Sequence, residues 1–505
     1  MIRSPVAAMH DITPLDRILG HSAQRPAIFD PNGHLTYGSL AARSAAVAQK
    51  ILAGRRTLDG SRVAMMLGPG AQFVETLMGI WRAGGSAVPL SALQTPPELA
   101  EVLAVAAPEA IVVDTPEKWD KVASAARAPR IGRRLTPADW DAAHAPAGEF
   151  SALNQTPAGE AVLLFTSGTT GRPKGVRISH AAVAATLDSL SEAWRWQKDD
   201  RLLHALPLDH THGLLVALLG SLWAGARVQF IRFEAGDVWD ALERTTVLMA
   251  VPTMYVRLVD AFRAAEPARR SRWAKGAGAL RLATSGSAAL SGRLHAAFAE
   301  VSGQTILERY GMTEIGMALS NPYDGPRIPG TVGLPLPRVE VDIVDEAEQP
   351  VREGEAGELR VRSPQLFLEY VGDSEATSAS FDSLGRFRTG DTAERGADGY
   401  VRILGRTSVD ILKSGGYKLS ALEVEEVLRG HPGIADVAVI GAPDPVWGEC
   451  VTACVVPRPG STLTLDDVRA FARASLAPYK LPRALRVLSE LPRSPIGKVQ
   501  KKLLS

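Results

Sequence analysis

The sequence predicts an α/β protein, with parallel sheets covered by helices on both faces, followed by a small α+β domain. Through most of the chain, short apolar runs alternate with helical patterns, which is typical of parallel sheets. After Val339 the pattern changes to apolar and charged residues in alternation with turns, which favours antiparallel strands. Helical and strand patterns then recur on a smaller scale beyond residue 410.

Each element of this fold class rests on its own pattern. The strands of the large region are predicted at residues 62–67, 86–90, 110–113, 161–165, 227–231 and 247–251. Residues 72–83 have apolar side chains at helical spacing, and 125–154 are expected to be a weakly patterned connector. The antiparallel part begins with 340–344. The small domain is predicted to have helices at 421–428 and 465–474 and strands at 436–440 and 451–455.

Composition limits the classes of function. A chain of 505 residues that is 46% hydrophobic can form two or more domains with sizeable cores. Its 56 basic and 55 acidic residues nearly cancel, so nucleic acid and anionic membranes are not expected partners. No apolar run reaches the roughly 18 residues of a membrane span and no secretory pattern opens the chain, which favours the cytoplasm. Cys450 and Cys454 are too few for a disulfide framework and favour core packing.

One segment predicts phosphate binding. The apolar residues 163–165 lead into hydroxyls, glycines and one lysine, in the order Thr166, Ser167, Gly168, Thr169, Thr170, Gly171, Arg172, Pro173 and Lys174. Glycine lets backbone N–H groups approach an anion, the hydroxyls add donors, and the lysine adds a mobile positive charge. The segment is not a Walker A loop, because Gly175 stands where that motif requires a hydroxyl.

This string resembles the signature of the adenylate-forming superfamily, which includes acyl-CoA synthetases, luciferases and peptide-synthetase adenylation domains. The resemblance implies that the loop binds ATP and that Thr169 lies near Mg²⁺. A second motif, residues 309–314, follows a strand predicted at 305–307. By resemblance, Tyr310 binds adenine, together with Gly311 and Met312. Thr313 binds the α-phosphate, and Glu314 binds Mg²⁺.

Further motifs of the superfamily occur in the required order. Asp391 and Arg406 resemble the ribose contacts, and Lys498 resembles the lysine that bridges the substrate carboxylate and the α-phosphate during adenylation. The loop 410–417 resembles the one that replaces Lys498 after the small domain rotates, with Lys413, Gly415 and Gly416 expected at coenzyme A. The resemblance implies a large N-terminal domain with a distorted β-barrel, 1–404, a hinge at 405–410, and a mobile domain, 411–505. The hinge residue remains open among Ser408, Val409 and Asp410.

The histidine motif His210-Thr211-His212-Gly213 resembles the superfamily's gate between acyl pocket and thiol tunnel. His210 is expected to take part in catalysis, although which of His210 and His212 forms the gate is open. Zinc is not expected here, because no further ligands with suitable spacing accompany the two histidines.

Three polar residues at pocket-lining positions predict the acid. An arginine buried without a partner is strongly unfavourable, and a second substrate carboxylate would satisfy it. Arg309 precedes the adenine Tyr310, Arg257 lies one turn into a predicted helix, and Ser287 lies in a small-residue turn. From the residues alone, two alternatives to carboxylate binding stay open. Arg309 could form an internal pair with Glu308 or another acid, and Arg257 could lie on a solvated helix face. The motifs at 252–257, 285–288, 308–314, 321–325, 406–411 and 415–418 resemble those of malonyl-CoA synthetases. This resemblance implies that the three residues hold the distal carboxylate and that Thr211 and Met317 border C2.

The sequence therefore predicts a ligase that uses ATP, Mg²⁺ and coenzyme A to activate malonate, and also methylmalonate. The alternatives are a ligase for another short or aromatic acid, a stand-alone adenylation domain that loads a carrier protein, and a non-catalytic nucleotide-binding scaffold. A monomer or weak homodimer is expected, located in the cytoplasm or, in a eukaryote, the mitochondrial matrix.

Overall fold

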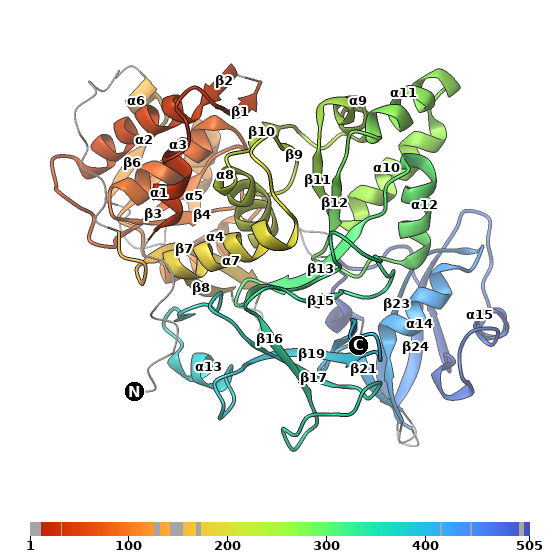
Figure 1. Cartoon of the computed structure of the whole chain (residues 1–505). Coiled ribbons are helices and arrows are strands. Elements are labelled where there is room, and N and C mark those ends of the chain that lie inside the picture. Colours follow the sequence, from red (N-terminus) through yellow and green to blue (C-terminus); the bar gives the residue numbers. More distant parts are fainter. Residues whose placement is uncertain are drawn as a thin grey trace. The chain divides into compact units, whose positions relative to one another are not determined.

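A computed structural model describes residues 12–31, 33–125, 132–141, 155–167, 173–414, 417–444, 447–493 and 499–504 (Figure 1). The chain divides into two compact units, of which the first comprises Met1–Glu340 with Arg362–Phe387 and the second Val341–Val361 with Arg388–Ser505. The second unit is larger than the mobile domain expected at 411–505, because it includes the antiparallel strands that precede the expected hinge. The hinge at 405–410 stays a prediction.

Two sheets form the first unit. In strand order, the described residues of one sheet are β15 (Leu334–Pro335), β14 (Gly316–Ser320), β13 (Leu307–Met312), β12 (Leu282–Ser285), β11 (Val247–Ala250), β9 (Arg201–His204), β10 (Arg227–Phe230), β1 (Pro26–Asp30) and β2 (Gly33–Thr36). The other has β18 (Glu369–Tyr370), β8 (Pro173–Ser179), β7 (Glu160–Ser167), β4 (Ser86–Pro89), β3 (Arg62–Met66), β5 (Ala110–Val113) and β6 (Arg133–Leu135). Their central strands are parallel, which confirms the predicted α/β class.

Helices cover and separate these sheets. They are α1 (Pro14–Leu19), α2 (Tyr37–Leu52), α3 (Ala71–Arg82), α4 (Pro96–Ala106), α5 (Pro116–Ala125), α6 (Ala138–Asp141), α7 (His180–Ala193), α8 (Gly220–Trp223), α9 (Ala235–Ala241), α10 (Pro252–Ala264), α11 (Pro267–Ala277), α12 (Gly292–Ser302) and α13 (Ser374–Ala379). Helix α7 contacts β7 and β8 of one sheet and β14 of the other. It is buried on nearly all sides and rich in alanine, as a helix between two sheets must be.

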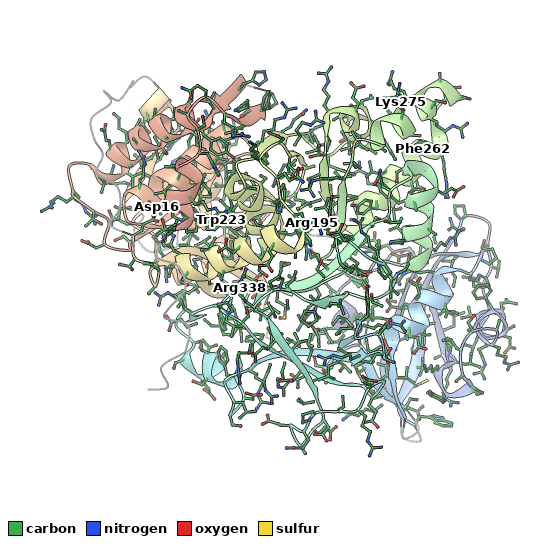
Figure 2. All side chains as sticks on the ribbon, in the orientation of Figure 1. Asp16, Arg195, Trp223, Phe262, Lys275 and Arg338 are labelled. Atoms are coloured by element: carbon green, nitrogen blue, oxygen red, sulfur yellow. The ribbon has the colours of Figure 1, made fainter. Side chains whose placement is uncertain are left out.

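One buried tryptophan, Trp223, links three helices of the first unit (labelled in Figure 2). Trp223, at the end of α8, is buried, and its indole N–H donates to Asp188 of α7 over 3.1 Å. The guanidinium of Arg17 lies 4.3 Å from the centre of the same indole ring and bridges to Asp188 as well. One tryptophan thus links helices α1, α7 and α8, which fixes the layer beside the candidate site.

Two further sheets belong mainly to the second unit. The first contains β16 (Glu340–Val344), β17 (Gly357–Arg362), β19 (Phe387–Arg395) and β20 (Val401–Arg406). The distorted barrel stays a prediction. The second contains β21 (Ile411–Ser414), β22 (Tyr417–Ser420), β23 (Ile434–Asp444), β24 (Gly448–Pro457) and β25 (Ala484–Val487). Helices α14 (Ala421–Arg429) and α15 (Leu465–Ala472) pack on the latter. Cys454 is buried in it and both cysteines are free, in agreement with a packing role.

Two local predictions differ from the structure. The motif 309–312 was expected to follow a strand at 305–307, but it lies within β13 itself, because it pairs with β14 in an antiparallel hairpin. The expected connector 125–154 contains β6 and α6, while residues 126–131 and 142–154 lie outside the described part.

The apolar run after His212 forms a π-helix, His212–Leu219, that continues into α8. Among the described residues no helix is both long and apolar enough to cross a bilayer.

Candidate active site

The predicted phosphate loop connects β7 to β8. The antiparallel pairing of these strands places Lys174 opposite Thr166 and Pro173 opposite Ser167, so the two ends of the loop are fixed by backbone hydrogen bonds. The ammonium nitrogen of Lys174 lies 4.7 Å from the centre of the Tyr370 ring. Gly168, Thr169, Thr170, Gly171 and Arg172 lie outside the described residues, so their predicted contacts with ATP stay predictions.

A hairpin between β13 and β14 presents the second motif. Gly311 is required there, because a Cβ at this position would lie 2.2 Å from the carbonyl oxygen of Gly316. Gly316 has φ +63°, in the left-handed region that favours glycine. Glu314 lies in the turn and is buried, and one of its carboxylate oxygens accepts a hydrogen bond from the Tyr370 hydroxyl over 3.0 Å. Tyr370 thus contacts both Lys174, which belongs to the predicted phosphate loop, and Glu314, which the resemblance assigns to Mg²⁺.

Arg309 is a buried cation of the first unit. Only 3% of its surface is exposed, and its Nε and Nη2 atoms have no hydrogen-bond partner within the described part of the chain. The internal pair with Glu308 that the sequence left open does not form. A carboxylate oxygen of Glu308 instead accepts from the backbone N–H of Leu290 over 3.2 Å. Burial lowers the pKa of Arg309 to about 10.

Gly286 makes room for this guanidinium. A Cβ on Gly286 would lie 2.4 Å from the Cζ atom of Arg309, so any larger residue would displace the side chain. The next residue, Ser287, has φ +71°, a strained conformation for a residue with a side chain. Strain of this kind is typical of functional sites, and here it occurs beside an unpaired charge.

The gate motif lies next to Arg309. The ring of His212 is buried, its Nδ1 atom is 3.5 Å from the Ser287 hydroxyl, and its Nε2 atom has no partner among the described residues. Burial, followed by the charge of Arg309 and by His204, holds the pKa of His212 well below its ordinary value. The imidazole is therefore neutral at pH 7 and can either donate or accept a hydrogen bond.

Thr211 connects this group to the phosphate motif. It lies at the start of the π-helix, and its hydroxyl donates to the hydroxyl of Thr313 over 3.2 Å. His212 contacts Ser287, the adjacent Thr211 contacts Thr313, and the charge of Arg309 acts on His212, so we treat these five residues as one group. Chemically, this group offers a buried positive charge beside three hydroxyls and a neutral imidazole.

Other predicted residues lie less directly in this group. Met317 is buried on β14, and its backbone N–H donates to Gln365 over 3.0 Å. His210 is half exposed, with its Nε2 atom 3.6 Å from Asp209. Arg257, on α10, is more than half exposed and lies 3.4 Å from Glu234 and over the ring of Phe233. No described contact joins Arg257 to Arg309, so its part in a carboxylate clamp stays a prediction.

The second unit contains the predicted ribose residues. Asp391 on β19 and Arg406 on β20 are paired across the ladder, and their side chains form an ion pair of 3.0 Å. The backbone N–H of Arg406 also donates to the Asp410 carboxylate over 3.0 Å. Lys413 is exposed, whereas Gly415, Gly416 and Lys498 lie outside the described residues.

Comparison with known proteins identifies the chain. The family of AMP-binding enzymes matches residues 15–371, and the C-terminal domain of AMP-binding enzymes matches residues 423–498. The chain belongs to the AMP-binding enzyme family. Its motifs at 166–174, 309–314 and 391 therefore occur in the expected order within a recognised member of the family.

Individual relatives cover nearly the whole of this AMP-binding enzyme. It is 41% identical to the mitochondrial malonate–CoA ligase ACSF3 of Mus musculus, over 95% of this chain and 88% of that protein. The structure is similar to the crystal structure of ATP-bound MatB from Rhodopseudomonas palustris, with a TM-score of 0.88, 35% identity, and 97% and 98% of the two chains covered. A malonyl-CoA ligase product complex with methylmalonyl-CoA and AMP matches with a TM-score of 0.67 and 38% identity, over 93% and 97%.

Two residues of this AMP-binding enzyme's site were missed by sequence reasoning. Tyr370 lies far along the chain from the motifs it touches, and only the pairing of β18 with β8 brings it beside Lys174. Gly286 was seen only as part of a small-residue turn. An available signal was the small-residue pair Gly286-Ser287 directly after a strand, where close approach of another group often selects glycine.

Proposed function

We propose that this protein is an ATP-dependent malonate–CoA ligase that also accepts methylmalonate. The carboxylate attacks the α-phosphorus of ATP to give an acyl-adenylate and pyrophosphate, and the coenzyme A thiol then attacks the acyl carbon and expels AMP. Membership of the family and the 41% identity to a malonate–CoA ligase support this activity. Fatty acid metabolism is a consistent role, because malonyl-CoA, the thioester of a three-carbon diacid, can supply two-carbon units after loss of carbon dioxide.

The observation that carries the choice of acid is the unpaired guanidinium of Arg309. A buried arginine with no carboxylate partner is strongly unfavourable, so the folded protein retains it at a cost. A substrate with two carboxylates can react through one and pair the other with Arg309, with Ser287 and neutral His212 as additional hydrogen-bond partners. Acetate or a fatty acid would leave the charge unpaired.

Magnitudes support strong rejection of monocarboxylates. Each charge-assisted hydrogen bond that is lost costs roughly 1.5–3 kcal/mol, and a monocarboxylate loses at least two. One added methyl group changes burial by only about 0.8 kcal/mol. The preference for malonate over acetate should therefore be large, and the preference between malonate and methylmalonate small.

Roles for the remaining residues follow from family membership and local geometry. The loop 166–174 and Thr313 would hold the phosphates, Tyr310 the adenine, and Asp391 with Arg406 the ribose. Lys498 would approach the reacting oxygens during adenylation, and Lys413 with the glycines 415 and 416 would contact coenzyme A in the second step. His210 is proposed near the gate. These assignments are proposals.

Magnesium fits the donors present. Mg²⁺ in nucleotide sites is bound by one or two carboxylates together with phosphate oxygens and water, and the described residues contain no cluster of three or more metal-ligating side chains. The buried carboxylate of Glu314, fixed on one oxygen by Tyr370, would hold the ion, with Thr169 as a second proposed ligand. The ion would neutralise charge on the phosphates.

The deciding experiment is pyrophosphate release with ATP, Mg²⁺ and coenzyme A against malonate, methylmalonate, succinate, acetate and benzoate. Release confined to the first two acids is expected. Preference for a monocarboxylate would contradict the dicarboxylate pocket but not the family. Transfer to a holo-carrier protein instead of coenzyme A would favour a carrier-loading enzyme, and no release with any acid would favour a scaffold.

Location and assembly are also proposals. The mitochondrial names of the animal relatives are consistent with a matrix enzyme in a eukaryote, and a cytoplasmic location is proposed otherwise. A monomer or weak homodimer is proposed.

A further inference from the structure

The sheet that carries the candidate site around Arg309 also has a pair of arginines, Arg201 and Arg227, at the opposite end of its strands. Strand β9 begins at Arg201, whereas Thr211 and His212 follow its carboxyl end. Arg201 on β9 and Arg227 on β10 are direct partners in the parallel register. Paired residues of neighbouring strands point to the same face, so the two guanidinium groups emerge side by side.

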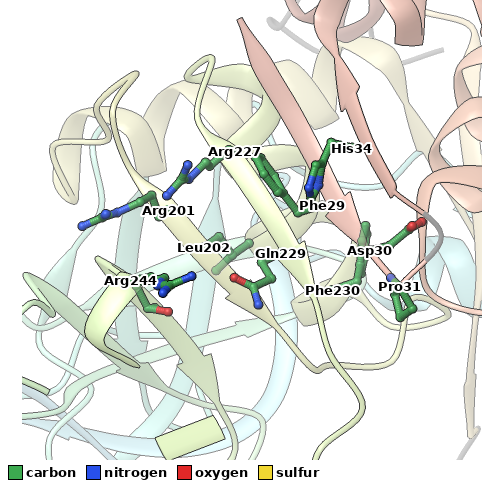
Figure 3. Close-up of a pocket in the computed structure, with 11 residues that line it drawn as sticks. Phe29, Asp30, Pro31, His34, Arg201, Leu202, Arg227, Gln229, Phe230 and Arg244 are labelled. Carbon is green, nitrogen blue, oxygen red and sulfur yellow. The ribbon is translucent and has the colours of Figure 1, made fainter. Parts of the chain in front are cut away.

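The two faces of this part of the sheet differ sharply. Leu202, Val228 and Ile28 point to one face and are almost fully buried. The opposite face carries the two arginines, the exposed Gln229 and Phe29, together with one buried residue, Leu203. It borders a cavity of about 480 Å³ (Figure 3).

The cavity is charged asymmetrically. Arg201, Arg227 and Arg244 gather on one side of it, and Phe29, His34 and Asp30 lie on the other (Figure 3). Among the described residues, neither Arg201 nor Arg227 has a carboxylate within ion-pair distance. The guanidinium of Arg227 instead lies 5.2 Å from the centre of the Phe29 ring. Arg244 is mostly exposed and reaches only its neighbour Glu243, over 3.5 Å.

Three carboxylates border this cavity or the adjoining depression, which shares Arg201 and Arg227 with it. Each of them forms its ion pairs or hydrogen bonds with other groups. Asp200 accepts from Arg281 over 2.6 Å and from Thr246 over 2.9 Å. Asp199 lies 3.6 Å from Arg25. Asp30 accepts from the backbone N–H of Ala71 at the start of α3, over 2.7 Å.

Like charges directly opposite each other on neighbouring strands destabilise a sheet unless an anion lies between them. Burial, and then the charge of Arg201, lower the pKa of Arg227, which agrees with two cations facing each other without compensation. Guanidinium groups bind phosphate oxygens in a bidentate way, and three of them around one cavity match an anion of more than two negative charges.

We propose that this cavity binds an oligophosphate, an anion of two or more linked phosphoryl groups, at a site separate from the catalytic one. Arg201 and Arg227 hold one phosphoryl group between them, and Arg244 with the Gln229 amide contacts the next. The source of the oligophosphate is either inorganic or the polyphosphate part of a nucleotide. None of the cavity's lining residues belongs to the catalytic group around Arg309.

The test is equilibrium dialysis of the full chain with radiolabelled pyrophosphate, at constant ionic strength set with sodium chloride. We expect the double variant R201Q/R227Q to bind about one pyrophosphate fewer per chain than the unmodified protein, while pyrophosphate at the catalytic site remains. The matched control R263Q/R293Q removes two exposed positive charges of the same unit and should bind as the unmodified protein does. Equal binding by R201Q/R227Q and the unmodified protein would overturn the proposal.

A second variant guards against misfolding of the first. R201K/R227K preserves both charges but removes the planar forks, so the extra site should weaken at least tenfold. Unchanged affinity in this variant would mean general attraction to positive charge and would also overturn the proposal. Malonate-dependent pyrophosphate release by each variant confirms that the fold is intact.

Competition distinguishes the two sources of the ligand. The unmodified protein is expected to bind one pyrophosphate that R201Q/R227Q does not bind. Tripolyphosphate, ATP and adenosine are each titrated to displace this pyrophosphate from the unmodified protein. Displacement by ATP at lower concentration than tripolyphosphate supports a nucleotide, and the reverse order supports an inorganic oligophosphate. Displacement by sulfate at the same concentration as tripolyphosphate contradicts an oligophosphate site.

Discussion

Arg309 in the first unit and Lys501 in the second are both buried cations, and their surroundings are opposite. Arg309 is 3% exposed and has unpaired nitrogens, whereas Lys501 is 9% exposed and bridges Asp410, over 2.5 Å, and Glu425, over 2.6 Å. Burial lowers the pKa of Arg309 to about 10. Burial also opposes the charge of Lys501, but Glu425 and Asp410 outweigh it and raise the pKa of Lys501.

The difference separates a binding group from a structural one. A buried charge with two carboxylates is satisfied by the chain itself and stabilises the fold as long as all members are present. A buried charge without a partner stabilises nothing in the free protein, and its pairing is left to a ligand. Lys501 therefore fixes Asp410, one of the three hinge candidates, whereas Arg309 is the group proposed to pair with the second carboxylate of the substrate.

The largest expected effect comes from Arg309→Met. Loss of at least two charge-assisted hydrogen bonds should lower kcat/KM for malonate by roughly 10²–10⁴-fold. The melting temperature should stay equal or rise, because the variant removes an uncompensated buried charge. Pyrophosphate release and calorimetry measure the two quantities on the same preparation.

Arg257→Met is the matched comparison for this variant. The structure pairs Arg257 with Glu234 at the surface, which predicts a small loss, whereas the resemblance to malonyl-CoA synthetases predicts a loss close to that of Arg309. Retained malonate activity in Arg309→Met would contradict the carboxylate pocket, and a fall of its melting temperature by many degrees would show that Arg309 has a structural role.

Lys501→Met should have the next largest effect, and on stability. The variant leaves Asp410 and Glu425 buried without their shared cation, which costs about 3–5 kcal/mol. Hydrogen exchange of the α14 amides reports on the second unit alone and should accelerate strongly. Lys502→Met, at the exposed neighbouring lysine, is the control and should exchange as the unmodified protein does. Unchanged exchange in Lys501→Met would show that the bridge contributes nothing.

Much of the fold follows from the sequence, because buried parallel strands are continuous apolar runs. Residues 110–113 are fully apolar and form β5 with the predicted bounds. The motif at Tyr310 was placed after a strand because glycine and polar residues read locally as a turn. Pairing with β14 in a hairpin decides otherwise, because the strand extends through the motif up to the turn at residues 313–315.

The candidate site was predictable in its residue types but not in its contacts. Arg309, Ser287 and His212 were identified from motifs, and the structure brings them together. That Glu308 bonds to Leu290 instead of Arg309 depends on which strand face each side chain occupies, which no local pattern reveals. The contact of Arg257 with Glu234 likewise depends on the path of the chain before β11.

The two units should also differ in how their stability depends on pH, because buried histidines lie in the first unit. Burial lowers the pKa of His180 and of His204 to about 4 in the first unit. The two histidines of the unfolded chain take up protons near pH 6.5, whereas the buried ones of the folded chain stay neutral until about pH 4. The stability that their burial allows is therefore complete above pH 6.5 and is lost as pH falls. Each should cost roughly 1 kcal/mol per pH unit below 6.5.

Urea unfolding at pH 7.0 and 5.5 measures this loss. His180→Gln should reduce it by about 1 kcal/mol, which is one histidine's share. His34→Gln changes an exposed histidine and serves as control. The second unit has the opposite dependence through Lys501, whose raised pKa gives stability that is present below its unfolded pKa and is lost as pH rises through the folded value. Equal acid sensitivity of His180→Gln and the unmodified protein would contradict burial of a neutral ring.

The smallest expected effect concerns the methyl group of methylmalonate. Thr211→Ser preserves the hydroxyl that donates to Thr313 and removes one methyl from the wall proposed to border C2. The freed space is worth about 0.8 kcal/mol, so the ratio of kcat/KM for methylmalonate to that for malonate should rise about fourfold. Thr211→Val has the opposite design, because it keeps the shape and removes the hydroxyl. It should lower both activities without changing their ratio, since its partner Thr313 is proposed to hold the phosphates. If Thr211→Ser leaves the ratio unchanged while Thr211→Val lowers both activities, Thr211 supports the phosphate motif only, and the border of C2 must be sought at Met317.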